Sequence, residues 1–167
     1  MNNSIRVFLS LLFIFFTIQC NDKPKVKDSG LFKMNAEKLE ASCSAEGGRS
    51  CTAIGRQYKF GTYGHAIDYQ IASDYFRKGC DSGDAYGCKE LGLLAQNGQG
   101  MPQDVTMATT LYKSACENKV SIACHYLGEM YRQGRELTRD FKKARHYYEK
   151  ACKLGSKWSC TKATELQ

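Results

Sequence analysis

Cysteine pairs eight positions apart recur along this 167-residue chain at a nearly constant step. The four stretches that carry them are CSAEGGRSC at 43–51, CDSGDAYGC at 80–88, CENKVSIAC at 116–124 and CKLGSKWSC at 152–160. Successive first cysteines are separated by 37, 36 and 36 residues. A period in the mid-thirties is typical of a solenoid, in which supersecondary units stack because no unit can bury its apolar face alone.

The repetition extends beyond the cysteines and indicates two helices in each unit. The aligned positions are Ile54-Gly55, Leu91-Gly92 and Leu127-Gly128, then Gly61, Gly98 and Gly134, then Asp68, Asp104 and Asp140, and finally Ala72, Ala108 and Ala144. We expect the first helix of each unit to stop at the glycine and the second to begin at the aspartate, whose side chain can cap free amides. In the third unit, helical spacing predicts a buried stripe of Phe141, Ala144, Tyr147, Tyr148 and Ala151.

Two regular disulfide schemes are compatible with stacked helical hairpins. In the first, bonds such as Cys51–Cys80 and Cys88–Cys116 leave Cys43 and Cys160 unpaired. In the second, the end of one hairpin is joined to the start of the next, and no repeat cysteine is left free. We predict the second scheme, with the disulfides Cys43–Cys51, Cys80–Cys88, Cys116–Cys124 and Cys152–Cys160. Zinc sites favour two to four residues between cysteines, so neither a metal nor a cofactor is expected.

The first residues are typical of an export signal. Arg6 precedes the apolar run VFLSLLFIFFTI, which is too short to span a bilayer, so residues 1–19 are interpreted as a signal peptide. Cys20 follows and resembles the lipidated cysteine of bacterial lipoproteins, although Gln19 stands where Gly, Ala or Ser is usual. Ordinary cleavage that leaves Cys20 as a free thiol is the alternative. Nine cysteines is an odd number, and lipidation of Cys20 accounts for the ninth.

These features predict an exported lipoprotein, periplasmic or on the cell surface of a bacterial envelope and attached to a membrane through its N-terminal lipid. Residues 20–30 would form the lipidated tether. The export route also supplies the oxidising environment that disulfides require.

The stretch GDAYGCKELGLLAQNGQGMPQD, followed by ATTLYKSAC, resembles a Sel1-like repeat, a tetratricopeptide-related αα-hairpin. The paired cysteines resemble those of the Helicobacter cysteine-rich branch, and the likeness covers about residues 43–160. It implies an all-α, right-handed superhelix whose concave face binds proteins or peptides. The repeats would span 44–80, 81–116 and 117–152, between capping helices at 31–43 and 153–167. The resemblance also implies a second activity, because members of this branch bind penicillins and slowly hydrolyse β-lactams.

In related repeats, one row of residues on the first helix of each unit lines the concave face. Carried across by register, that row predicts the binding residues Arg49, Thr52, Arg56, Lys59, Phe60, Tyr86, Lys89, Leu93, Gln96, Asn97, Ile122, His125, Glu129, Arg132 and Gln133. The mixture of aromatic, aliphatic and charged side chains suits a peptide or protein surface. The alternative is an ordinary solvated face.

A serine β-lactamase usually combines S-x-x-K with S-D-N and K-T-G motifs. The chain contains one S-x-x-K, from Ser159 to Lys162, and neither of the other motifs. We interpret this match as accidental and expect no catalytic residue, with a penicillin-binding protein or weak β-lactamase as the alternative function.

The formal net charge of +7 does not by itself indicate a nucleic-acid partner. The most basic stretch, RDFKKARHYYEKACK at 139–153, places its aromatics in the predicted buried stripe of a helix. Export also argues against nucleic acid, and attraction to anionic lipids or cell-wall polymers is the alternative role for the charge. We expect a monomer.

Overall fold

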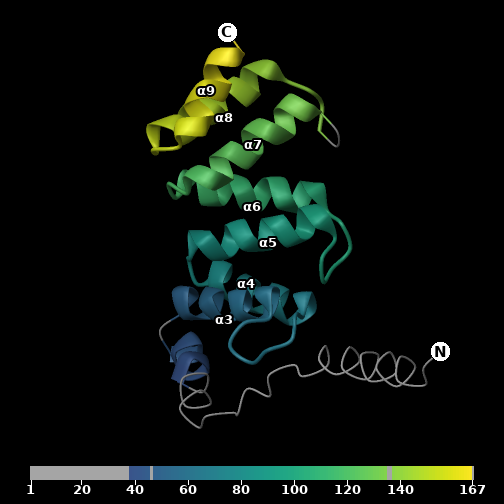
Figure 1. Ribbon diagram of the computed structural model, residues 1–167, viewed down its shortest axis with the longest axis vertical. Coiled ribbons are helices and arrows are strands. Elements are labelled where there is room, and N and C mark those ends of the chain that lie inside the picture. Colours follow the sequence, from purple (N-terminus) through teal and green to yellow (C-terminus); the bar gives the residue numbers. More distant parts are fainter. Residues whose placement is uncertain (1–37, 46, 135–136, 167) are drawn as a thin grey trace, which may run out of the picture.

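The computed structural model describes residues 38–45, 47–134 and 137–166, and it is a stack of helical hairpins with no strand in those residues (Figure 1). A helical stretch at 38–45 precedes seven helices: α3 (Gly48–Phe60), α4 (Tyr69–Asp81), α5 (Ala85–Asn97), α6 (Val105–Glu117), α7 (Ser121–Gln133), α8 (Phe141–Lys153) and α9 (Lys157–Glu165). The predicted all-α solenoid is confirmed. The signal peptide, Cys20, its tether and residues 31–37 of the first capping helix lie outside the described residues.

The second helix of each hairpin begins at the aspartate that the repeat predicts. A side-chain oxygen of each aspartate accepts a backbone N–H three residues later, in the pairs Asp68–Ile71, Asp104–Met107 and Asp140–Lys143. Each such cap stabilises its helix by about 1 kcal/mol. The backbone N–H of each aspartate also donates to the preceding helix, at Tyr58, Ala95 and Tyr131. The aspartate therefore fixes both the loop and the start of the next helix.

The first helix of each hairpin ends at the predicted glycine. Gly61, Gly98 and Gly134 have left-handed φ values of 61°, 65° and 64°. Side chains other than glycine adopt this conformation at a cost, which is why glycine recurs there.

A second set of glycines lets the two helices of a hairpin approach closely. A Cβ on Gly55 would lie 2.6 Å from the ring of Phe76, one on Gly92 would lie 2.9 Å from Tyr112, and one on Gly128 would lie 2.6 Å from Tyr148. All three rings are fully buried. The Leu-Gly register of the sequence thus places one aromatic ring of the second helix on the bare backbone of the first.

The four predicted disulfides are all present, and each joins the end of one hairpin to the start of the next. They are Cys43–Cys51, Cys80–Cys88, Cys116–Cys124 and Cys152–Cys160. The Cα atoms are 4.5–4.8 Å apart, within the range that a disulfide spans. In the entropic account, closing a loop of this length stabilises each junction by roughly 2–3 kcal/mol. The alternative scheme, with Cys51 bound to Cys80 and Cys88 to Cys116, is thereby excluded.

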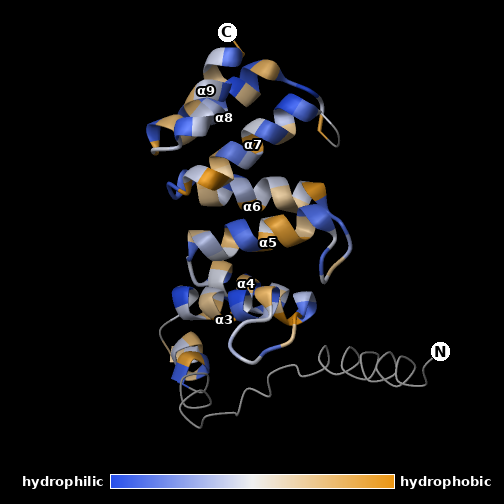
Figure 2. Cartoon of the chain, viewed as in Figure 1, coloured by the Kyte–Doolittle hydropathy of each residue, from blue (hydrophilic) through white to orange (hydrophobic). Residues whose placement is uncertain are grey.

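The apolar residues form short patches along each helix rather than long runs, as one buried stripe per helix requires (Figure 2). In the predicted stripe of α8, Ala144, Tyr148 and Ala151 are buried, but Tyr147 is only half-buried and Phe141 is 45% exposed. The prediction for Phe141 was wrong. At the equivalent start of α4, the loop after α5 covers Tyr69 through Gly100. The ring of Phe141 instead lies beneath the guanidinium of Arg139, whose Cζ is 4.4 Å from the ring centroid.

Candidate functional site: the first-helix face

Contacts across the stack place the first helices of successive hairpins close together. Lys59 Nζ of α3 donates to Glu90 Oε2 of α5 at 2.6 Å, and His125 of α7 contacts Ser159 of α9. Among helices that are not consecutive, α3 and α5 share the most extensive contact. In the described part of the chain, α4, α6 and α8 share no hydrogen bond with one another. We name the exposed surface of α3, α5, α7 and α9 the first-helix face.

Large side chains occupy the second position of every first helix. Tyr86 is 58% exposed, Ile122 is 48% exposed and Trp158 is 60% exposed. The equivalent residue of α3 is the exposed Arg49. Repeat register predicted Arg49, Tyr86 and Ile122 as binding residues but not Trp158, because 153–167 was expected to be only a capping helix. A further step of 36 residues from Ile122 would have found it.

The predicted binding residues differ widely in exposure. The exposed ones are Arg49, Arg56, Phe60, Tyr86, Asn97, Ile122 and Gln133. The half-buried ones are Lys59, Lys89, Leu93, Gln96, Glu129 and Arg132. Thr52 and His125 are buried, with 5% and 8% of their surface exposed. Neighbouring helices cover both, because Thr52 lies against Gly79 and Gly87 whereas His125 contacts Ser159 and the ring of Tyr148.

Two of the half-buried lysines are held by an acidic side chain that is not among the predicted binding residues. Glu90 is 6% exposed and accepts hydrogen bonds from both Lys59 and Lys89. Burial by itself would raise the pKa of Glu90, but the two lysines outweigh it and hold the pKa below its usual value. The carboxylate therefore stays ionised, and these lysines are engaged within the fold.

Glu129 is the centre of a second polar cluster on the face. It accepts hydrogen bonds from Arg132, Gln133 and the hydroxyl of Tyr148. Burial opposes ionisation of Glu129, yet these donors outweigh it and lower the pKa to about 2. Tyr148 thus joins α8 to the first-helix face of α7.

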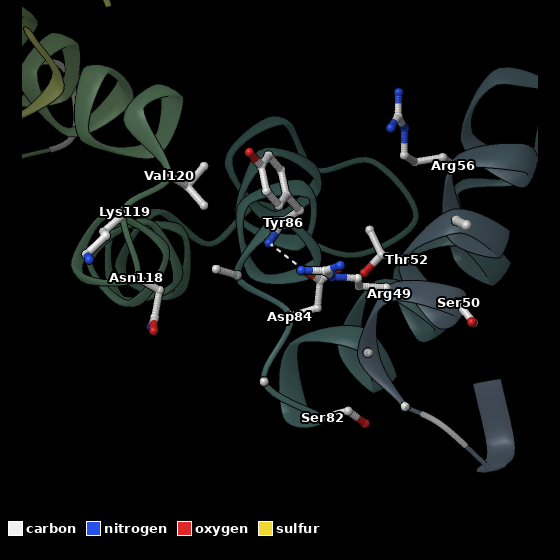
Figure 3. Close-up of a pocket in the computed structure, with 15 residues that line it drawn as sticks. Arg49, Ser50, Thr52, Arg56, Ser82, Asp84, Tyr86, Asn118, Lys119 and Val120 are labelled. Carbon is white, nitrogen blue, oxygen red and sulfur yellow. Dashed lines mark hydrogen bonds between the residues drawn. The ribbon is translucent and has the colours of Figure 1, made fainter. Parts of the chain in front are cut away.

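A groove of about 930 Å³ crosses the starts of α3, α5 and α7. Its walls come from α3 as far as Arg56, from the first turn of α5 and from the loops at 82–84 and 118–120. Figure 3 shows Arg56 and Thr52 on one side, Lys119 and Val120 on the other, and Tyr86 between them. The loop residues were absent from the predicted site, since sequence register identified helix positions only.

The S-x-x-K serine has a partner that sequence reasoning did not anticipate. Ser159 Oγ lies 3.0 Å from His125 Nδ1 and 2.8 Å from Ser156 Oγ. Burial lowers the pKa of His125, which keeps the imidazole neutral near pH 7. Ser159 is fully buried, however, and Lys162 Nζ donates to Glu165 instead. The arrangement joins α7 to α9 and offers a substrate no access to the hydroxyl.

The described residues contain neither a metal cluster nor a membrane-spanning element. No group of three His, Cys, Asp or Glu side chains is placed to hold a metal ion in those residues. Within the same residues, no helix has both the length and the apolar character needed to cross a bilayer.

Comparison with known proteins finds three consecutive matches to the Sel1 repeat, at residues 49–84, 85–120 and 121–156. Among curated proteins, the chain is 36% identical over 77 residues to the Helicobacter pylori (strain J99) protein named "Putative beta-lactamase HcpE". That alignment covers 46% of the chain and 19% of the relative. The chain therefore spans about a fifth of that relative's length.

Solved structures show the same fold. Helicobacter pylori cysteine-rich protein B has a TM-score of 0.61 at 25% identity, with 78% of this chain and 92% of that one covered. A protective antigen of uropathogenic Escherichia coli has a TM-score of 0.72 at 23% identity, and the match covers 77% of this chain and 27% of the antigen. A Sel1 repeat protein of Oxalobacter formigenes has a TM-score of 0.64 at 24% identity, and the match covers 68% of this chain and 46% of that protein.

Proposed function

Because the chain belongs to the Sel1 repeat family, a family of helical scaffolds, we propose that it binds protein or peptide partners through its first-helix face. We further propose that it is exported and anchored to an envelope membrane through a lipid on Cys20. The apolar leader, the position of Cys20 after it and the four disulfides of the remaining eight cysteines support this location.

The observation that carries the binding proposal is the exposed row of Tyr86, Ile122 and Trp158. Burying large apolar side chains away from water is favourable, so a stacked row of exposed ones favours a surface that is covered in use. Aromatic residues in such positions are the ones that dominate binding energy at protein interfaces. The row runs along the stack, so an extended segment of a partner would contact successive repeats in the same way.

The polar clusters give this surface a fixed shape. Glu90 and Glu129 hold their neighbouring lysines and arginine within the face, so little side-chain entropy remains to be lost there on binding. The disulfides between hairpins also reduce the entropy that is lost on binding, because they restrict movement of one repeat against the next.

A second candidate function is β-lactam binding or hydrolysis. The hydrogen bond between His125 and Ser159 favours it, because a serine beside a neutral histidine is the starting arrangement of many acyl-transfer sites. The name of the Helicobacter relative points in the same direction. The complete burial of Ser159 weighs against this candidate.

The binding proposal is tested by selecting peptides on the immobilised, oxidised protein from a random displayed library. Their affinities are then measured by calorimetry for the unchanged protein and a triple variant, Tyr86→Ser, Ile122→Ser and Trp158→Ser. A matched control replaces three other exposed apolar residues with serine, namely Ile67, Ile71 and Phe141. Circular dichroism checks that both variants fold.

We expect the row variant to lose at least about tenfold in affinity, because each large anchor contributes about 1–2 kcal/mol or more. The control is expected to change affinity less than about twofold. Equal losses in the two triple variants, or an unchanged affinity of the row variant, would refute the proposal.

A further inference from the structure

Resting on the proposed binding function, we infer that the groove across the starts of α3, α5 and α7 selects an acidic peptide segment. Its carboxylates pair with Arg49, Arg56 and Lys119, and a neighbouring apolar side chain packs on Tyr86. The groove therefore determines which partners the first-helix face accepts.

The three cations of the groove have no acidic partner within the described residues. Arg49, Arg56 and Lys119 are all exposed, and none takes part in an ion pair there. Among the residues that the structure describes, the one acid in the groove lining is Asp84, which accepts a hydrogen bond from the backbone N–H of Tyr86. The formal charge of the described lining residues is therefore 3 − 1 = +2. A positive surplus of this kind favours an acidic partner.

Two acids of the first-helix face are engaged elsewhere, and the exposed Asp81 and Glu117 beside the two loops form no ion pair with the groove cations. Glu90 is bound by Lys59 and Lys89, and Glu129 is bound by Arg132. The first-helix face thus carries two internally satisfied charge clusters beside a groove whose three cations form no ion pair in the described residues.

The backbone conformation at Lys119 favours a binding role for its side chain. Lys119 has a left-handed φ of 66°, whereas the equivalent residues of the neighbouring junctions are Gly83 and Gly155, with φ values of 86° and 95°. Glycine adopts this conformation without strain and lysine does not. The chain accepts that cost where Lys119 lines the groove beside Val120. Local strain of this kind concentrates at binding sites.

The helix ends add to the positive potential. Of the three helices whose starts line the groove, α5 is capped by Asp84, whereas α3 and α7 begin at Gly47 and Val120 without a side-chain cap. Both uncapped residues line the groove. The free amides at those two starts carry partial positive charge and complement a carboxylate.

Peptide fits the groove better than nucleic acid does. Binding of a nucleic-acid backbone usually engages about 6–10 phosphates, and the groove offers three unpaired cations. Tyr86 and the adjoining Ile122 and Trp158 instead supply separate contacts for apolar side chains. An extended peptide that alternates acidic and apolar residues would use both features.

The test uses three labelled peptides of equal length with leucine at alternate positions and Glu, Lys or Ser at the others. Binding to the full chain, purified oxidised in mild detergent, is measured by fluorescence anisotropy at low and high salt. The variants are Arg49→Glu with Arg56→Glu, and Lys119→Gly. The matched control is Arg77→Glu with Lys113→Glu, which makes the same charge change on exposed residues of α4 and α6.

We expect the Glu peptide to bind at least about tenfold more tightly than the Lys peptide, with the difference shrinking at high salt. The Arg49 and Arg56 double variant should weaken the Glu peptide about tenfold or more, Lys119→Gly should weaken it severalfold, and the control should leave it within about twofold. Equal binding of the three peptides, or equal losses in the groove and control variants, would overturn the inference. Displacement of the Glu peptide by an oligonucleotide at lower concentration than by unlabelled Glu peptide would also overturn it.

Failure of this inference is distinguishable from failure of the proposed function. If library-selected peptides lose affinity in the Tyr86, Ile122 and Trp158 variant but show no dependence on the groove cations, the face binds peptides and the acidic selectivity is wrong. If neither the designed nor the selected peptides bind, both proposals are wrong.

Discussion

His125 Nδ1 of α7 lies 3.0 Å from Ser159 Oγ of α9, and this buried hydrogen bond joins the last two first helices of the stack. Ser159 also contacts Ser156, the N-cap residue of α9. The position of the S-x-x-K serine is thus explained by packing. The same contact determines what should happen when either residue is changed.

Replacing Ser159 with alanine leaves the buried imidazole of His125 without this partner. We expect the free energy of unfolding to fall by about 1–3 kcal/mol, the usual cost of an unsatisfied buried polar group. Urea denaturation followed by circular dichroism measures it. Ser114→Ala, at an exposed position of α6, is the control and should change stability by less than about 0.5 kcal/mol. A Ser159→Ala protein as stable as the unchanged one would contradict this role.

Stability should depend on the protonation of His125. Burial lowers the pKa of His125 in the folded protein below the value of about 6.5 in the unfolded chain. The unfolded state then binds more protons near this pH, so this contribution to stability is full above pH 6.5 and is lost as the pH falls below it. Unfolding free energies at about pH 7.5 and about pH 5.5 should differ more for the unchanged protein than for His125→Gln. An identical pH dependence in both would show that the histidine is not shielded from water.

The burial of Ser159 predicts no β-lactam turnover. Incubation of the oxidised protein with a chromogenic cephalosporin and a penicillin should give neither product release nor an acyl adduct by intact mass. Turnover or an adduct that disappears in Ser159→Ala would establish a serine enzyme. Activity that survives that substitution would place a nucleophile elsewhere on the stack.

Lys119→Gly should stabilise the fold while it weakens peptide binding. Glycine relieves the left-handed backbone strain at φ 66°, which is worth about 1 kcal/mol. Thermal and urea denaturation measure the gain. Lys113→Gly, within the helix α6, is a useful contrast, because there glycine should cost about 1 kcal/mol. A loss of stability at position 119 would mean that the lysine side chain contributes packing rather than binding.

The regular parts of the fold could be predicted because each position recurs in successive repeats. Asp68 illustrates this, since its alignment with the other two aspartates indicated a cap that the structure confirms. The disulfides, such as Cys80–Cys88 and Cys116–Cys124, were predictable for the same reason. Of the two regular pairings, only the one observed leaves no repeat cysteine free.

The parts that could not be predicted depend on neighbours that differ between repeats. Phe141 aligns with Tyr69, but Tyr69 lies beside Gly100 of the next hairpin whereas Phe141 is 45% exposed, so register alone gave the wrong burial. Glu90 was missed because its partners, Lys59 and Lys89, come from two different helices. Assigning Lys119 to the groove required its position in space as well as its place in a loop.

The central claim, that partners bind along the first-helix face, is tested most directly by the fluorescence of Trp158. It is the only tryptophan of the chain and is 60% exposed on that face. Titration with a library-selected peptide should give a saturable shift of emission to shorter wavelength and protection from iodide quenching. The Tyr86→Ser, Ile122→Ser variant retains the tryptophan and should require at least about tenfold more peptide. Emission and quenching that stay unchanged at peptide saturation would contradict the claim.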